Sequence, residues 1–129
     1  MSRQDLEDLA RRFVGAFTDG DEATQAALLA PDVVAYITNK DAGVDEVRGR
    51  DAYLARMPAL RAAGAELTVT QALAIEDDRV MFAVEISAHR AGDDLHNFAA
   101  FLARVSGGQI AELWMVEAQP AHSDEFWSR

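Results

Sequence analysis

The first part of the chain has the hydrophobic spacing of a helix. Apolar side chains three or four residues apart predict one buried helical face. These side chains are Leu6, Leu9, Phe13 and Phe17. Ser2 and Asp5 have the spacing of a capping box, and Gly20 is suited to end the helix. The pattern therefore predicts a helix that begins near Ser2 and ends before Gly20.

The next thirty residues change pattern three times. A second helix is expected at Asp21–Ala30, because Pro31 cannot continue it. The stretch Val33–Thr38 is rich in β-branched and aromatic residues, which favours a short strand. The polar stretch Asn39–Arg48 predicts a loop.

A third helix and a series of strands make up the rest of the chain. The helix is expected between Gly49 and Gly64, and Pro58 should kink or break it. After Gly64 the apolar positions alternate with polar ones, which indicates half-buried strands. The expected strands are Leu67–Ile75, Val80–His89, Leu95–Val105 and Gln109–Ala118.

This order of elements predicts an α+β fold. Helices come first with one short strand among them, and a four-strand antiparallel meander follows. We expect one domain over residues 1–129, with N-terminal helices packed on one face of a curved, mainly antiparallel sheet. Residues 119–129 form a C-terminal tail, whose Phe126 and Trp127 could dock on the body, dock on a partner or cover a pocket mouth.

The length of the last hairpin loop decides which side chains face each other. A three-residue loop Ser106–Gly108 pairs Val105 with Gln109, Phe101 with Leu113, and Asn97 with Glu117. A two-residue loop would instead bring Phe101 across from Trp114. The longer loop is preferred, for a reason that depends on the resemblance described below.

With the longer loop, both faces of the sheet are largely apolar. The chain's own helices can cover one face only. The other face presents four large apolar side chains, a patch larger than a soluble monomer usually exposes. They are Phe98, Leu102, Trp114 and Val116. We therefore expect a homodimer that packs sheet on sheet.

Composition and charge exclude several classes of function. The chain has 129 residues, 12 Lys and Arg, 22 Asp and Glu, and a formal net charge of −10, which argues against nucleic-acid and anionic-membrane partners. It has no cysteine, and His89, His96 and His122 lack the spacing of metal ligands. No apolar run reaches the ~20 residues of a membrane span. We expect a cytoplasmic protein without metal or cofactor.

Four stretches resemble one known superfamily. They are Leu9–Asp21, Leu28–Val33, Arg48–Tyr53 and Gly107–Trp114. In this order and spacing, the chain resembles the nuclear transport factor 2-like superfamily, which includes ketosteroid isomerase and SnoaL-like polyketide cyclases. The resemblance implies a cone-shaped half-barrel whose helices close around a pocket, commonly dimeric through the sheet. Its cavity-facing positions match the longer hairpin loop.

The resemblance does not carry over the family's catalytic residues. The isomerase's oxyanion tyrosine falls on Phe13, its general base on Ile37 and its oxyanion-hole acid on Phe101. The acid of the cyclases falls on Met115. None of these side chains can transfer a proton, so neither ketosteroid isomerase nor standard cyclase activity is expected.

A pocket inside the cone remains the expected site. Its apolar lining is predicted as Phe13, Phe17, Ile37, Met57, Val84, Ile86, Phe101, Leu113 and Met115. Glu117 and Asn97 are its polar members, with Glu117 as the proton-transferring group and Asn97 supporting it. Alternatively, the apolar residues simply fill the cone as core and Glu117 is a hydrated residue at the rim. Tyr36 and Tyr53 are interpreted as packing residues.

Two hypotheses of function follow from this pocket. The first is a domain that binds a small apolar or polyketide-like ligand and acts on it by acid–base chemistry, as an isomerase, cyclase or lyase. The second is a non-catalytic dimeric module that binds a ligand or scaffolds a partner. Glu117 and Asn97 favour the first hypothesis, and the missing family acids favour the second.

Overall fold

The computed structural model describes residues 1–90 and 92–128 of the chain, with the side chain of Arg90 left out. Helices and strands follow in the order α1 (Arg3–Thr18), α2 (Glu22–Ala27), β1 (Leu29–Thr38), β2 (Val44–Arg48), α3 (Arg50–Leu54), α4 (Met57–Ala62), β3 (Glu66–Ile75), β4 (Arg79–Arg90), β5 (Asp93–Ser106), β6 (Gln109–Glu117) and α5 (Pro120–Trp127). The six strands form one sheet in the order β2-β1-β6-β5-β4-β3. All neighbours are antiparallel except β1 and β6, which are parallel.

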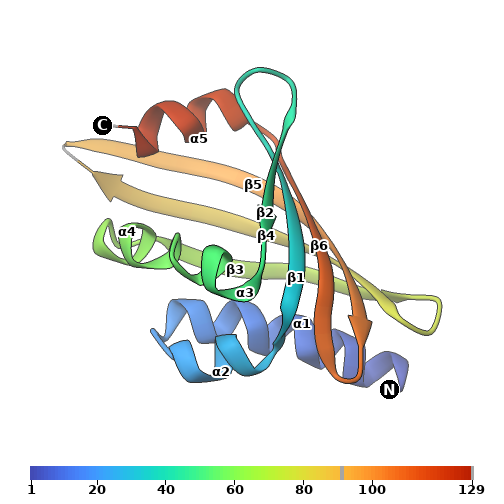
Figure 1. Cartoon of the computed structure of the whole chain (residues 1–129). Helices are drawn as coiled ribbons and strands as arrows, with labels where there is room; N and C mark the ends of the chain where they lie inside the picture. Colours follow the sequence, from blue (N-terminus) through green and yellow to red (C-terminus); the bar gives the residue numbers. More distant parts are fainter. Residues whose placement is uncertain (91, 129) are drawn as a thin grey trace.

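The sheet curves, and the helices lie on its concave side (Figure 1). Helix α1 packs along β3, and α5 packs back toward β5. The expected α+β cone with helices on a curved, mainly antiparallel sheet is confirmed. No helix in the described part of the chain is long and apolar enough to cross a membrane.

Helix α1 forms as its sequence predicts. Ser2 accepts from the backbone N–H of Asp5, and the Asp5 carboxylate accepts from the backbone N–H of Ser2, which completes the capping box. The predicted face is buried, and it supplies Leu6, Leu9, Phe13 and Phe17 to the core. Helix α1 therefore forms one wall of the cone interior.

The prediction of a helix at Asp21–Ala30 is wrong at its end. Helix α2 ends at Ala27, and Leu29 is already in β1, where it pairs with Ile110 of β6. Pro31 lies inside β1, in the stretch where the register with β6 shifts between Leu29 and Val34. A proline is tolerated there because this irregular stretch needs no ladder N–H from it.

The prediction of a loop over Asn39–Arg48 is also wrong. Residues Val44–Arg48 form β2, an edge strand that pairs with β1. Its side chains are mostly exposed, so the strand is polar where a buried strand would be apolar. The expected break at Pro58 is confirmed, since α3 ends at Leu54 and Pro58 lies in the first turn of α4.

The preferred three-residue hairpin loop is wrong, but the predicted faces are right. Ser106 pairs with Gln109 across a two-residue turn, in which Gly107 and Gly108 both have positive φ. A bulge then shifts the register, so that Phe101 pairs with Met115 rather than with Leu113. The total displacement is two residues, which leaves every side chain on its predicted face.

The C-terminal stretch predicted as a tail is ordered as helix α5 over Pro120–Trp127. Phe126 is buried, and its ring packs edge-on against Trp127 at 4.8 Å between centroids. Arg129, the last residue of the predicted tail, lies outside the described residues. Helix α5 lies beside β5, on the opposite side of the molecule from α1 (Figure 1).

Candidate functional site

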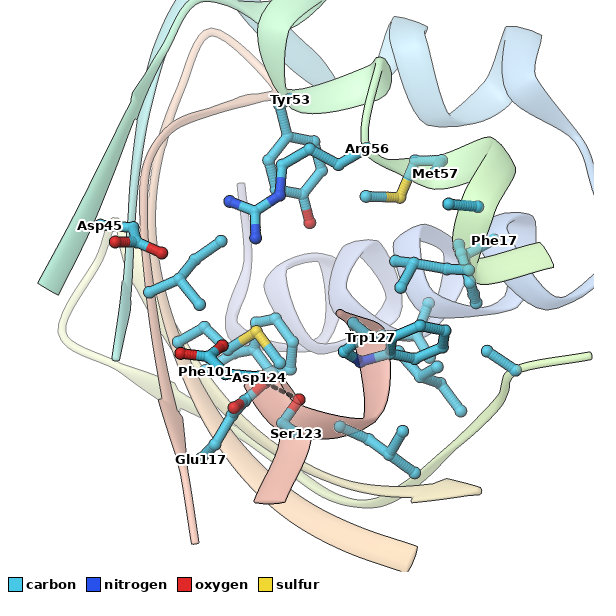
Figure 2. Close-up of a pocket in the computed structure, with 18 of the residues that line it drawn as sticks. Phe17, Asp45, Tyr53, Arg56, Met57, Phe101, Glu117, Ser123, Asp124 and Trp127 are labelled. Carbon is cyan, nitrogen blue, oxygen red and sulfur yellow. Dashed lines mark hydrogen bonds between the residues drawn. The ribbon is translucent and has the colours of Figure 1, made fainter. Parts of the chain in front are cut away.

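The concave face of the sheet and the helices enclose a cavity of about 520 Å³. Residues of α1, the α3–α4 segment, the sheet and α5 all line it (Figure 2). Seven of the nine predicted apolar lining residues do so, namely Phe13, Phe17, Ile37, Met57, Ile86, Phe101 and Met115. Val84 and Leu113 do not line the cavity and are buried in the adjoining core. The interior of the fold is therefore hollow between the sheet and these helices.

One row of side chains crosses four strands, and its members on β5, β6 and β1 form the floor of the cavity. Phe82 of β4 pairs with Phe101 of β5, Phe101 pairs with Met115 of β6, and Ile37 of β1 follows. The rings of Phe82 and Phe101 stack at 4.8 Å between centroids. Because the row is entirely apolar, it favours the apolar part of a ligand.

The four positions at which the resemblance would require ionisable residues all face this cavity. They are Phe13, Ile37, Phe101 and Met115. Their side chains offer a ligand dispersion contacts and no proton. Any acid or base of this site must therefore come from other positions.

Glu117 carries its carboxyl on the cavity wall. On the neighbouring strands, Ala99 of β5 lies directly across from Glu117, and Val84 of β4 lies across from Ala99. Neither side chain can hydrate a carboxylate. Ser123 Oγ of α5 donates a hydrogen bond to Glu117 Oε1 at 3.3 Å (Figure 2). Burial raises the pKa of Glu117 to about 7, the charge of Asp124 adds to the rise, and the Ser123 hydrogen bond and Arg56 oppose it.

Asn97 does not lie where the predicted register placed it. The two-residue turn and the bulge together move Glu117 opposite Ala99, so Glu117 is not across from Asn97, whose partner on β4 is Ile86. Asn97 is fully buried and holds the corner between β6 and α5. Its Nδ2 donates to Gln119 O at 3.2 Å, and its Oδ1 accepts from the backbone N–H groups of Gln119 and Phe98. Asn97 is thus a structural partner of α5 and does not line the cavity.

Tyr53, which the sequence suggests is a packing residue, and Arg56, which no sequence pattern indicated, are further functional candidates. Both line the cavity from α3 and the residues after it. Burial raises the pKa of the Tyr53 hydroxyl to about 12, so it is protonated at neutral pH. The signal was their spacing, since Arg56 lies three residues after Tyr53 and one before the predicted lining residue Met57.

A small polar network closes the helical side of the cavity. Gln25 is buried, and its Oε1 accepts from Arg61 Nη2 at 2.9 Å. Arg61 also pairs with Glu22 at 2.7 Å and lies over the Phe17 ring. These groups satisfy one another, so their role here is structural.

Acidic groups line the outer side of the cavity. Asp45 of β2 accepts from Asn39 Nδ2 at 3.0 Å, and Asp124 of α5 accepts from the backbone N–H of Lys40 at 2.8 Å. Within residues 1–90 and 92–128, no three His, Asp or Glu side chains gather as a metal site would require.

Comparisons with known proteins agree with this geometry. A family model described as the SnoaL-like domain matches residues 10–113 of the chain. An uncharacterized protein of Mycobacterium tuberculosis (strain ATCC 25618 / H37Rv) is 36% identical over 124 residues, which is 94% of this chain and 95% of that protein.

Solved structures share the whole fold. Bal32a, from a soil-derived mobile gene cassette, superposes with a TM-score of 0.88 at 20% identity, over 97% of this chain and 98% of that one. A proposed ketosteroid isomerase of Kribbella flavida DSM 17836 has a TM-score of 0.74 at 23% identity, over 89% of this chain and 78% of that one. At these identities the likeness establishes the fold alone.

Proposed function

The chain belongs to the SnoaL-like domain family of the nuclear transport factor 2-like superfamily, and we propose that it binds a small, largely apolar or polyketide-like molecule and exchanges a proton with it through Glu117. The observation that carries the proposal is an apolar cavity of about 520 Å³ with the Glu117 carboxyl on its wall. This volume is within the range of small-molecule sites, roughly 300–1,000 Å³.

Glu117 is suited to proton transfer by its surroundings. Its side chain reaches the cavity, and its hydrogen bond from Ser123 leaves one carboxyl oxygen available to a ligand. A pKa of about 7 means that both protonation states are populated near neutral pH, which is where a general acid or base is most effective. The name of the Kribbella flavida neighbour is consistent with acid–base chemistry on an apolar substrate.

A two-stage experiment tests this proposal. Steroid-like and polyketide-like aromatic compounds are first screened by thermal shift, because a ligand that binds only the native state raises its melting temperature. Each hit is then incubated with the protein in deuterated water, and NMR follows exchange of its acidic C–H protons. We expect exchange with the unmodified protein and a loss of about 100-fold or more in Glu117→Gln.

Glu112→Gln is the matched control, because Glu112 is on the same strand and its side chain hydrogen-bonds to Trp114 on the convex face. The Glu112→Gln variant should exchange the C–H protons of each hit compound as fast as the unmodified protein does. A hit that binds both proteins and exchanges equally fast in Glu117→Gln would end the catalytic role of Glu117 and leave a binding protein.

A non-catalytic, dimeric ligand-binding or scaffolding module is the second candidate function. It is favoured by one observation, that the four positions at which the family's ionisable residues would lie carry Phe13, Ile37, Phe101 and Met115. Under this function the screen gives thermal-shift hits, and no hit exchanges protons faster with the protein than in buffer.

A further inference from the structure

The hydroxyl of Tyr53 is a buried polar group that faces the cavity without a partner. Tyr53 is 7% exposed, and among the described residues its hydroxyl makes no hydrogen bond. Every fully buried side-chain oxygen or nitrogen of those residues does have a partner, so the Tyr53 hydroxyl must reach open space. That space is the cavity, into which Figure 2 shows the hydroxyl pointing. A buried hydroxyl of this kind normally finds an acceptor.

Local backbone structure holds Tyr53 in this position. Gly49 caps α3 with a φ of 92°, which a side chain would strain, and its N–H donates to Val33 O of β1 at 2.7 Å. Tyr53 N–H then donates to Gly49 O at 3.1 Å. The Tyr53 ring is 6.2 Å from Phe13 between centroids, so the hydroxyl end is the part left for the cavity.

Arg56 brings a positive charge to the same wall. Its backbone N–H donates to Tyr53 O at 3.2 Å, and its guanidinium charge acts on both the Tyr53 hydroxyl and the Glu117 carboxyl. In the described part of the chain, the Arg56 side chain has no hydrogen bond and no ion pair. Arg61, one helical turn and a half further along, is by contrast held by Glu22 and Gln25.

The two groups together select the chemistry of a ligand's polar end. A guanidinium can donate and cannot accept, and a neutral tyrosine hydroxyl with a free proton needs an acceptor. The described acids that line the cavity are Glu117 at the end of β6, Asp124 on α5 and Asp45 on β2, and none of them is on the α3 wall (Figure 2). An acceptor oxygen would therefore bind at the α3 wall while the apolar part of the ligand lies on the Phe101–Met115 floor.

We propose that Tyr53 and Arg56 form a subsite for a carbonyl oxygen, of a ketone or of a carboxylate, on an otherwise apolar ligand. This inference rests on the proposed function, because it needs the cavity to be a ligand site. It goes further by stating which end of the ligand the α3 wall recognises. The ketone and the carboxylate share the acceptor oxygen and differ in charge.

Three probes of nearly equal size test the subsite. 2-Acetylnaphthalene presents a ketone, 2-naphthoate presents a carboxylate, and 2-ethylnaphthalene presents neither. Dissociation constants are measured with the full chain at pH 7 by calorimetry or ligand fluorescence. We expect at least one oxygen-bearing probe to bind tenfold or more tightly than 2-ethylnaphthalene. The probe that binds more tightly than 2-ethylnaphthalene, whether the ketone, the carboxylate or both, shows which kind of carbonyl oxygen the subsite accepts.

Variants assign the preference to the two residues. Tyr53→Phe and Arg56→Gln should each reduce it to less than threefold and leave the affinity for 2-ethylnaphthalene unchanged. Arg12→Gln removes the same charge from the exposed side of α1 and should keep the full preference. Arg56 is exposed, so its variant should fold, and circular dichroism checks both variants.

Each outcome separates this inference from the function on which it rests. If all three probes bind equally, the cavity is a ligand site and the subsite is wrong. If the preference persists in both variants, another group makes it and the subsite is again wrong. If no probe binds at millimolar concentration, the proposed binding function is overturned and the subsite with it.

Discussion

At the residue scale, the buried position of Glu117 means that ionisation of its carboxyl lowers the stability of the fold. Its pKa is about 7 in the folded chain against an ordinary value of 4.5, so the folded state binds the proton more tightly than the unfolded state. Folding stability is therefore unaffected below about pH 4.5, decreases between pH 4.5 and 7, and carries the whole penalty above pH 7. The carboxyl that we propose for proton transfer therefore destabilises the folded state above pH 4.5.

Glu117→Gln should remove this penalty. Gln keeps the acceptor for Ser123 Oγ and cannot ionise, so the variant should be more stable than the unmodified protein at pH 8 by about 1–2 kcal/mol. The figure is below the full linkage value because solvent reaches part of the carboxyl. Urea unfolding at pH 4 and pH 8 measures the difference, which should vanish at pH 4. An equal difference at both pH values would mean that the Glu117 carboxyl is not desolvated.

Phe82 and Phe101 form a matched pair that tests whether the cavity is open. They stack on each other and are both buried, but only Phe101 lines the cavity. Phe82→Ala should cost about 3–5 kcal/mol of unfolding free energy, and Phe101→Ala about 1–2 kcal/mol less, because one side of Phe101 has fewer contacts to lose. Denaturant unfolding measures both. Equal costs would mean that the cone is filled at Phe101.

Prediction from the sequence is most accurate where the alternation of side chains along a strand alone determines which face of the sheet each residue occupies. The side chains of the floor and of Glu117 face the cone because a strand alternates at every residue, and the register error of two residues left this unchanged. Partners along the row depend on the bulge, so the expected support of Glu117 by Asn97 was wrong. The interpretation of Tyr53 as a packing residue missed its hydroxyl, and Arg56 was not identified, because a missing hydrogen-bond partner has no counterpart in a sequence.

At the element scale, α5 is attached to the sheet by a few polar contacts. Asn97 bonds Gln119 at the start of the helix, Ser123 bonds Glu117, and Asp124 bonds the Lys40 backbone of the β1–β2 loop. Ser123, Asp124 and Trp127 also line the cavity. The position of α5 therefore determines how much of the cavity is covered.

Asn97→Ala should loosen α5. The change leaves the N–H and C=O of Gln119 without their buried partner and should cost about 2–3 kcal/mol of unfolding free energy. Amide hydrogen exchange should become faster in residues 120–127 than in α1, whose contacts the change does not touch. Uniformly faster exchange across both helices would instead show that Asn97 stabilises the whole sheet.

Polarity and proline positions do not suffice to predict two elements, the strand β2 and the end of α2. The strand β2 was missed because an edge strand with exposed side chains has the composition of a loop. The end of α2 was misplaced because Pro31 stops a helix and is also tolerated in a bulged strand. In both places pairing with β1 or β6, far away in sequence, determined the outcome.

At the scale of the whole molecule, the convex face of the sheet is apolar across several strands. Leu73, Met81, Leu102, Trp114 and Tyr36 are consecutive neighbours in one row. Trp114 stacks on Tyr36 at 4.1 Å and is 39% exposed, while Phe98 and Val116 beside the row are 48% and 53% exposed. Polar contacts flank the row, a hydrogen bond between Glu85 and His96 and an ion pair between Arg104 and Glu112.

We propose that a second copy of the chain covers this face. An apolar centre with a charged rim is the usual composition of a homodimer interface. Trp114→Glu places a charge at the centre and should give a monomer, whereas the unmodified protein should be a dimer at micromolar concentration in sedimentation. Arg12→Glu, on the exposed side of α1, should remain a dimer. A monomeric unmodified protein would show that the convex face has another role.

The place of β6 in the sheet has a consequence for how the chain reaches its fold. β6 is the last strand to be synthesised, yet it lies between β1 and β5 in the sheet. Its pairing with β1 joins residues as far apart in sequence as Tyr36 and Trp114, which are 78 residues apart (114 − 36). Until residues 109–117 arrive, β1–β2 and the β3–β4–β5 meander each present an unpaired inner edge. Nascent chains therefore pass through a stage with two open edges, at which strand exchange between neighbouring chains competes with completion of the sheet.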